Sequence, residues 1–266
     1  MDLKLSGKKA LVAGASQGLG RAIAETLFAE GAHVAILSRS QEKLKQVKHE
    51  MIQKAPSRES EVRTYAVDVK NAPGLEHVFK DLAEQWGGID ILLANAGGPP
   101  VGSFDELSDE AYYDAFETNF MGTVRLIRGA LPFMRQRQGG RIGIITSQSV
   151  KEPIPGLLLS NAIRAGVTGL ARTLANEVAK DHILVNCFAP GRIDTERVRA
   201  LDEENARRAH VTTDDIKAKM TAAIPLGRYG QPDELARVVT FYLSFANTYV
   251  TGQTILIDGG KVGTLL

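Results

Sequence analysis

Three glycines near the start of the chain follow the spacing G-x-x-x-G-x-G. Gly14, Gly18 and Gly20 come after an apolar segment and open a segment with helical periodicity. The first glycine lets the chain turn sharply, and the other two let backbone approach a pyrophosphate and helix pack on strand. The N–H groups and positive dipole end of the helix would face the phosphates, which predicts a nicotinamide dinucleotide site. The other residues assigned to this turn are Ser16, Gln17 and Leu19.

The end of the second predicted strand decides which dinucleotide the turn would hold. An acidic residue about 20 positions beyond the glycines would bind the ribose 2′-hydroxyl of NAD, but no acid occurs from Gly31 through Gln41. Arg39 can instead pair with a 2′-phosphate, and Ser38 and Ser40 can add hydroxyl groups. The sequence therefore favours NADP(H). NAD(H), with Arg39 as a solvated surface charge, is the alternative interpretation.

Further motifs, in the same order along nearly the whole chain, resemble those of the short-chain dehydrogenase/reductase family. The glycine turn resembles the family's glycine motif, and residues 258–260 resemble its C-terminal D-G-G. The chain is particularly similar to reductases of the 3-oxoacyl-carrier-protein type. The resemblance implies an NADP(H)-dependent oxidoreductase acting on a carbonyl compound or secondary alcohol. It also implies cofactor contacts by Asp68 and Val69, by Asn95, Ala96 and Gly97, and by Pro190, Gly191, Ile193 and Thr195.

The catalytic group of the family is matched only in part. Asn119 matches its helix asparagine, and Ser147 matches the serine that ends the fifth strand. In the family a Tyr-x-x-x-Lys pair follows: the tyrosine transfers the proton, and the lysine holds the ribose and lowers the tyrosine pKa. Here the two positions, thirteen and seventeen residues after Ser147, hold Ser160 and Arg164. We therefore expect an atypical catalytic group made of these four residues.

The exchange alters the proton chemistry more than the cofactor site. Ser160 and Arg164 are four residues apart on one helix face, so the two side chains can still meet. A phenol has a pKa near ~10 that a cation can lower, whereas an aliphatic hydroxyl is a far weaker acid, so Ser160 cannot replace tyrosine by the same route. Arg164 can still bridge ribose hydroxyls but does not readily release a proton. Losing a positioned acid or base typically costs roughly 10²–10⁴-fold in rate.

Three outcomes stay open. The chain can be an oxidoreductase with another proton donor, for which Ser147, Ser160 through a water, and Lys151 are candidates. It can turn over slowly a substrate acidic enough to need little help. It can also be a non-catalytic NADP(H)-binding protein, such as a sensor or a structural partner. Structural alternatives exist as well, with Ser147 as a strand-end hydroxyl, Lys151 as a solvated charge and Asn119 as a bridge to helix backbone.

The elements that would position these residues alternate between strand and helix. Several predicted strands are continuous apolar runs, which is typical of parallel strands covered on both faces. The pattern predicts an α/β fold, a doubly wound (Rossmann) seven-stranded parallel sheet with helices on both faces in three αβα layers. Predicted strands cover 9–13, 33–37, 62–67, 89–94, 141–146, 183–188 and 254–257, and predicted helices lie near 19–30, 41–54, 74–86, 108–137, 157–180 and 232–245.

The segment 195–225 breaks this alternation. It contains no predicted strand, is rich in charge, and follows the C-terminal end of a strand, the edge where such sheets bind ligands. We expect a helical lid over the substrate, with a solvated surface insertion as the alternative. Because no linker divides the chain, residues 1–266 are expected to form one dinucleotide-binding domain.

The composition of the chain argues against several other classes of protein. The 32 basic and 31 acidic side chains give a net charge of +1, which argues against a nucleic-acid partner. The single cysteine, Cys187, excludes an internal disulfide and a four-cysteine metal site, and no metal is expected. No apolar run reaches the ~18 residues of a membrane span, and the start lacks a signal-peptide pattern, so we expect a cytoplasmic protein. The family resemblance implies a homotetramer.

Overall fold

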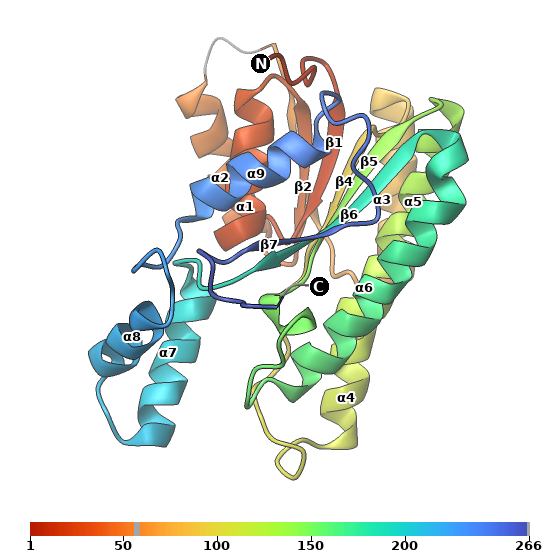
Figure 1. The fold of residues 1–266 in the computed structure, drawn as a ribbon. Coiled ribbons are helices and arrows are strands. Elements are labelled where there is room, and N and C mark those ends of the chain that lie inside the picture. The colour runs from red at the N-terminus through yellow and green to blue at the C-terminus, as the bar shows by residue number, and fades with distance from the viewer. Residues whose placement is uncertain (56–58, 265–266) are drawn as a thin grey trace.

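A single sheet of seven parallel strands organises the protein. The computed structural model describes residues 1–55 and 59–264. The strand order is β3-β2-β1-β4-β5-β6-β7, with helices on both faces (Figure 1), which confirms the predicted fold class. The order reverses between β1 and β4, and a parallel sheet binds ligands at such a switch point. The strands are β1 (Lys9–Ala13), β2 (His33–Ser38), β3 (Val62–Ala66), β4 (Ile91–Ala94), β5 (Gly140–Ile145), β6 (Ile183–Pro190) and β7 (Thr254–Ile257).

The core consists of two apolar layers, one on each face of the sheet. Successive strand residues alternate between them: in β1, Leu11 belongs to one layer and Val12 to the other. Helices α3, α5 and α6 complete the first layer, and α1, α2 and α9 complete the second. The helices are α1 (Gly18–Ala29), α2 (Gln41–Lys54), α3 (Ala72–Trp86), α4 (Asp109–Ala115), α5 (Gly122–Gln136), α6 (Leu158–Val178), α7 (Glu196–Ala209), α8 (Thr213–Ala222) and α9 (Pro232–Leu243).

The helix predicted over 108–137 is interrupted by a π-helical turn. Between α4 and α5 lies η1 (Phe116–Met121), and Asn119 is in its middle. The Asn119 amide donates to the carbonyl of Ala115 at 3.3 Å, and the Thr123 hydroxyl donates to the carbonyl of Asn119 at 2.7 Å. Such turns occur mostly as single insertions in α-helices, frequently at functional sites. Apolar periodicity continues through the turn, so the sequence pattern does not reveal it.

Other boundaries differ from the prediction by one or two residues, the usual uncertainty at element ends. β4 begins at Ile91 rather than at position 89, and β6 extends to Pro190. The segment 195–225 contains no strand, and its α7 and α8 project beyond the lower end of the sheet in Figure 1. In the described ranges, no helix has the length and apolar character needed to cross a membrane.

Candidate active site

A cleft of about 1070 Å³ runs along the carboxyl ends of the strands. Its walls come from loops far apart in sequence, because parallel strands deliver their following loops to one edge of the sheet. Every residue assigned from the sequence to the cofactor or to the four-residue catalytic group lines it, except Gly20. These lining residues are Gly14, Ser16, Gln17, Gly18, Leu19, Ser38, Arg39, Ser40, Asp68, Val69, Asn95, Ala96, Gly97, Asn119, Ser147, Ser160, Arg164, Pro190, Gly191, Ile193 and Thr195.

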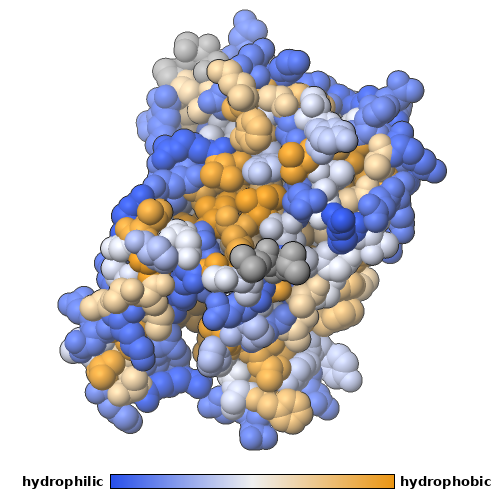
Figure 2. Space-filling view, viewed as in Figure 1, coloured by the Kyte–Doolittle hydropathy of each residue, from blue (hydrophilic) through white to orange (hydrophobic). Residues whose placement is uncertain are grey.

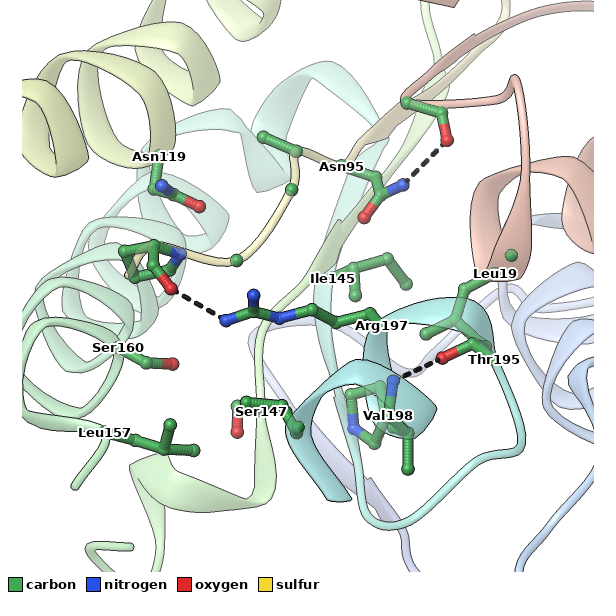
Figure 3. Close-up of a pocket in the computed structure, with 18 of the residues that line it drawn as sticks. Leu19, Asn95, Asn119, Ile145, Ser147, Leu157, Ser160, Thr195, Arg197 and Val198 are labelled. Carbon is green, nitrogen blue, oxygen red and sulfur yellow. Dashed lines mark hydrogen bonds between the residues drawn. The ribbon is translucent and has the colours of Figure 1, made fainter. Parts of the chain in front are cut away.

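The turn between β1 and α1 requires its glycines. Gly14 and Gly18 have φ of +62° and +57°, a left-handed conformation that favours glycine. A Cβ at Gly20 would lie 2.3 Å from the carbonyl oxygen of Gly14, so only glycine lets α1 pack this closely against the turn. The side-chain amide of Asn95, which follows β4, donates to the carbonyls of Ala13 and Gly14 at 3.3 Å each, and Figure 3 shows one of these bonds. The turn therefore presents backbone without side chains to the cleft, and such a surface fits a pyrophosphate.

Two cations border the cleft at the end of β2. Arg39 is exposed there, and Lys43 in the first turn of α2 donates to the Gln17 side chain at 2.8 Å. Within residues 1–55 and 59–264 neither has a carboxylate within salt-bridge distance. The buried Ser38 hydroxyl has no hydrogen-bond partner in that same part of the chain. This donor set fits a phosphate monoester. Lys43 was not predicted, although its place three residues after the helix cap Ser40 was a usable signal.

The residues of the expected catalytic group gather at the ends of β5, η1 and α6. The Ser147 hydroxyl accepts a hydrogen bond from the Ser149 amide at 3.1 Å, so it does cap a turn, but its own proton remains free for the cleft. Ser160 lies in the first turn of α6 and also lines the cleft. Figure 3 shows Ser160 and Asn119 on the same side of the cleft. Lys151, proposed from sequence as a proton donor, is not among the lining residues.

Arg164 ties α6 to the floor of the cleft. Its guanidinium donates to the carbonyl of Ile145 at 2.8 Å and to the Asn119 side chain at 3.5 Å. The side chain is buried, and burial lowers the pKa of Arg164 to about 10, with repulsion from Arg197 as a second cause. Arg164 therefore remains a cation near neutral pH and holds a fixed position rather than exchanging a proton.

The lid segment contributes the far wall of the cleft. Leu201 and Asn205 of α7 and Ile216 and Met220 of α8 all line it. The middle of α7 is anchored by Asp202, which accepts a hydrogen bond from Arg192 at 2.5 Å and one from the Tyr229 hydroxyl at 2.9 Å. The sequence indicated the segment but not its lining residues, because α7 is charged along most of its length.

The fold and the glycine turn define a Rossmann-type dinucleotide cleft, and comparison with known proteins identifies the family. A family model described as enoyl-(acyl carrier protein) reductase matches residues 14–261. The 3-oxoacyl-[acyl-carrier-protein] reductase FabG of Aquifex aeolicus is 34% identical over 262 residues, which cover 98% of this chain and 99% of that protein. The chain belongs to the short-chain dehydrogenase/reductase family.

Solved structures of the family match over the whole fold. L-sorbose reductase from Gluconobacter frateurii, in complex with NADPH and L-sorbose, is 33% identical with a TM-score of 0.93 and full coverage of both chains. An NADPH-bound short-chain oxidoreductase from Pseudomonas aeruginosa, described as containing an atypical catalytic center, is 29% identical with a TM-score of 0.86 and covers 97% of both chains. Similarity therefore extends to relatives with an altered catalytic group.

Proposed function

We propose that the chain binds NADP(H) in this cleft and acts as an oxidoreductase on a carbonyl compound or secondary alcohol, with an altered catalytic group. The observation that carries the proposal is the backbone turn bonded to Asn95, combined with Arg39 and Lys43 at the end of β2, two cations without a carboxylate partner among the described residues. The names of the relatives support it, because they are reductases and several are bound to NADPH.

The residues around the cleft divide the cofactor among them. The turn from Gly14 to Gly20 would hold the pyrophosphate, and Ser38, Arg39 and Lys43 the 2′-phosphate. The loop that ends with Thr195 closes over the cleft beside Leu19 (Figure 3) and would hold the carboxamide. When bound, NADPH supplies the hydride that reduces a carbonyl group.

The remaining chemistry falls to Ser147, Ser160 and Arg164. The Ser147 hydroxyl can donate to the carbonyl oxygen of the substrate, because its accepted bond leaves its proton free. The fixed charge of Arg164 favours negative charge developing on that oxygen. Since neither Ser160 nor Arg164 is an effective acid near neutral pH, the proton would come from a water held by Ser160. We expect turnover to be slower than with a tyrosine for this reason.

A non-catalytic NADP(H)-binding protein is the second candidate. The bonds of Arg164 to Ile145 and Asn119 favour it, because both serve to hold the fold together. The distinction between the candidates is whether the cleft turns substrate over, since binding is common to both.

A paired experiment tests the proposal. NADPH fluorescence measures binding, and a panel of carbonyl compounds is then assayed with the wild type, with Ser147→Ala and with Ser160→Tyr/Arg164→Lys. Wild-type turnover that Ser147→Ala abolishes supports the oxidoreductase. Tight NADPH binding with turnover only in the double variant would establish the non-catalytic protein instead. Tighter binding of NADH than of NADPH would contradict the cofactor assignment.

Three further features complete the proposal. Helices α7 and α8 act as a lid, because their side chains form one wall of the cleft. Residues 1–266 form one domain, since every strand in the described part of the chain belongs to the same sheet. The protein assembles as a homotetramer, as the family resemblance implies.

A further inference from the structure

Arg197, in the first turn of the lid helix α7, lacks an acidic partner. Among the described residues, no carboxylate lies within salt-bridge distance of its guanidinium. Every other arginine of this helix has one. Arg199 pairs with Asp194 at 2.8 Å, Arg208 pairs with Glu204 at 2.8 Å, and Arg207 also pairs with Glu204. The charge of Arg197 is therefore unbalanced on a helix that otherwise pairs its arginines.

The Arg197 side chain extends across the cleft. One of its terminal nitrogens donates to the carbonyl of Pro99 at 2.7 Å, and the guanidinium lies above Gly98, whose Cβ position would be 3.1 Å from it. Figure 3 shows the guanidinium end directed towards the side that carries Asn119 and Ser160 and away from Leu19. An arginine has five N–H donors, so most of those of Arg197 remain available, and the side chain is accessible from the cleft.

Several cations border the inner cleft, with Glu152 and Asp258 as the acidic groups nearest to Lys261. Arg164 and Arg197 repel each other, and removal from water lowers the pKa of Arg197. Lys261 also lines the cleft, and burial, with repulsion from Arg192, lowers its pKa. The acidic side chains that line the same region, Glu152 and Glu196, are exposed at its rim, and neither pairs with Arg197. A group with negative charge would relieve this repulsion.

We infer that Arg197 binds a carboxylate of the substrate, so that the carbonyl compound or alcohol handled here is an acid. That the substrate carries a carbonyl or alcohol group rests on the proposed function. That Arg197 binds a carboxylate does not. A planar guanidinium with free donors holds a carboxylate by paired hydrogen bonds. The dinucleotide diphosphate offers the same chemistry, but its predicted site is the Gly14–Gly20 turn, whereas the guanidinium of Arg197 is directed towards Ser160 and Asn119. A substrate carboxylate is therefore the better match.

Binding of acid and ester pairs tests the inference without requiring turnover. The NADP⁺-loaded protein, which cannot reduce a ketone, is titrated calorimetrically with acetoacetate, 4-oxopentanoate and 2-oxoglutarate and with their methyl esters. We expect at least one acid to bind more tightly than its ester. Arg197→Met should weaken the binding of that acid by about 10–100-fold and leave the binding of its ester unchanged, because a charge-assisted hydrogen bond to the carboxylate is lost. Arg199→Met, which removes a paired arginine of the same helix, is the control and should behave as the wild type.

Three results of these titrations would overturn the inference. Equal affinity for every acid and ester, or acid binding that survives Arg197→Met, removes the carboxylate site. If Arg197→Met instead weakens the binding of NADP⁺ and leaves the binding of the acids unchanged, the residue binds the diphosphate of the cofactor. If the wild type fails to bind NADP⁺, the proposed function fails, and the same titrations on the free protein still decide whether Arg197 holds an acid.

Discussion

Arg164 is held by neutral hydrogen-bond acceptors rather than by carboxylates, and it keeps its charge. The carbonyl of Ile145 and the side chain of Asn119 accept its hydrogen bonds, and burial lowers its pKa only to about 10. An arginine starts so high that this shift leaves it protonated across the physiological range. A lysine in the same place would start lower and become a proton donor more readily. Arginine at position 164 therefore supplies a fixed positive charge. With serine at position 160, the site has no phenol whose pKa such a charge would need to lower.

The pH profile of turnover follows from these ionisations. Below a pKa of about 10 Arg164 stays charged, and Ser160 does not titrate, so we expect no inflection from this pair between pH 6 and 9. Ser160→Tyr/Arg164→Lys introduces a phenol beside a cation, and because the protonated phenol is the proton donor in carbonyl reduction, turnover should then fall as pH rises through an apparent pKa below ~10. The measurement is kcat/KM against pH for both proteins. A wild-type inflection in this range that Arg164→Met removes would contradict the assignment of Arg164 as a fixed cation.

Cofactor preference is the second property set by single residues. Arg39→Ala and Lys43→Ala should each weaken NADPH binding by about tenfold, because each removes one charge-assisted contact to the 2′-phosphate. NADH, which lacks that phosphate, should bind both variants as it binds the wild type. Fluorescence titration with both dinucleotides gives the comparison. Lys45→Ala is the control, because Lys45 is an exposed lysine of the same helix that does not line the cleft. Equal losses for NADH and NADPH would show that the cations do not recognise the 2′-phosphate.

At the scale of elements, α9 is joined to the loop before it by an acidic residue. Glu234 accepts two hydrogen bonds from Arg228, at 2.7 and 2.6 Å, and one from the Gln231 amide at 2.7 Å. The contact with Arg228, followed by the amide bond, lowers the pKa of Glu234 from 4.5 to about 2. A carboxyl group whose pKa falls on folding stabilises the protein above its unfolded pKa, and that contribution is lost as pH falls through the folded value.

Glu234→Gln should therefore change how stability depends on pH. The wild type should be more stable than the variant above pH 4.5, and the difference should shrink as pH falls from 4.5 towards about 2. Urea unfolding at pH 7 and pH 3 gives the two differences. Asp233→Asn, whose carboxylate pairs with Arg237 in an exposed position, should show little of this dependence. A difference between the wild type and Glu234→Gln that is the same at both pH values would disprove the linkage.

Elements differed in how well the sequence predicted them, for physical reasons. Parallel strands of this sheet are short apolar runs between turn residues, so β1 and β7 were predicted with their observed bounds. The π-helical turn at Asn119 was missed, because one extra residue in a helix scarcely disturbs its apolar period. Arg197 was missed for a different reason: α7 is rich in arginine, and only the geometry shows which of these residues has no acidic partner.

Across the whole molecule, the order of motifs along the chain predicted the cleft because the topology is simple. Each strand of a parallel sheet ends at the same edge, so residues from Gly14 to Thr195 meet there once the strands are in register. Hydrophobic pattern and turn chemistry specify that arrangement. The position of α7 and α8 over the cleft depends instead on pairings such as Arg192 with Asp202, which no local pattern encodes.

The last strand leaves an apolar surface at one end of the sheet. β7 pairs with β6 on one side, and no described strand pairs with its other side. All four of its residues are partly exposed, and Figure 2 shows apolar side chains gathered on this face between the positions of α9 and β7 in Figure 1. Ile255 and Ile257 both pack partly against the core layer that α9 completes, so their side chains lie on this face of the strand. An unpaired apolar edge of this kind favours association with a second copy.

We therefore expect the wild type to elute as an oligomer and Ile255→Asp to lower its mass, because a carboxylate in an apolar interface is costly to bury. Size-exclusion chromatography with light scattering gives the mass of each. Ile52→Asp is the control, because it places the same charge on another partly exposed apolar residue, in α2 and far from β7 along the chain. Far-UV circular dichroism and NADPH binding are used to check that Ile255→Asp remains folded. A monomeric wild type would refute the homotetramer, and an oligomer that Ile255→Asp leaves intact would place the interface away from this face.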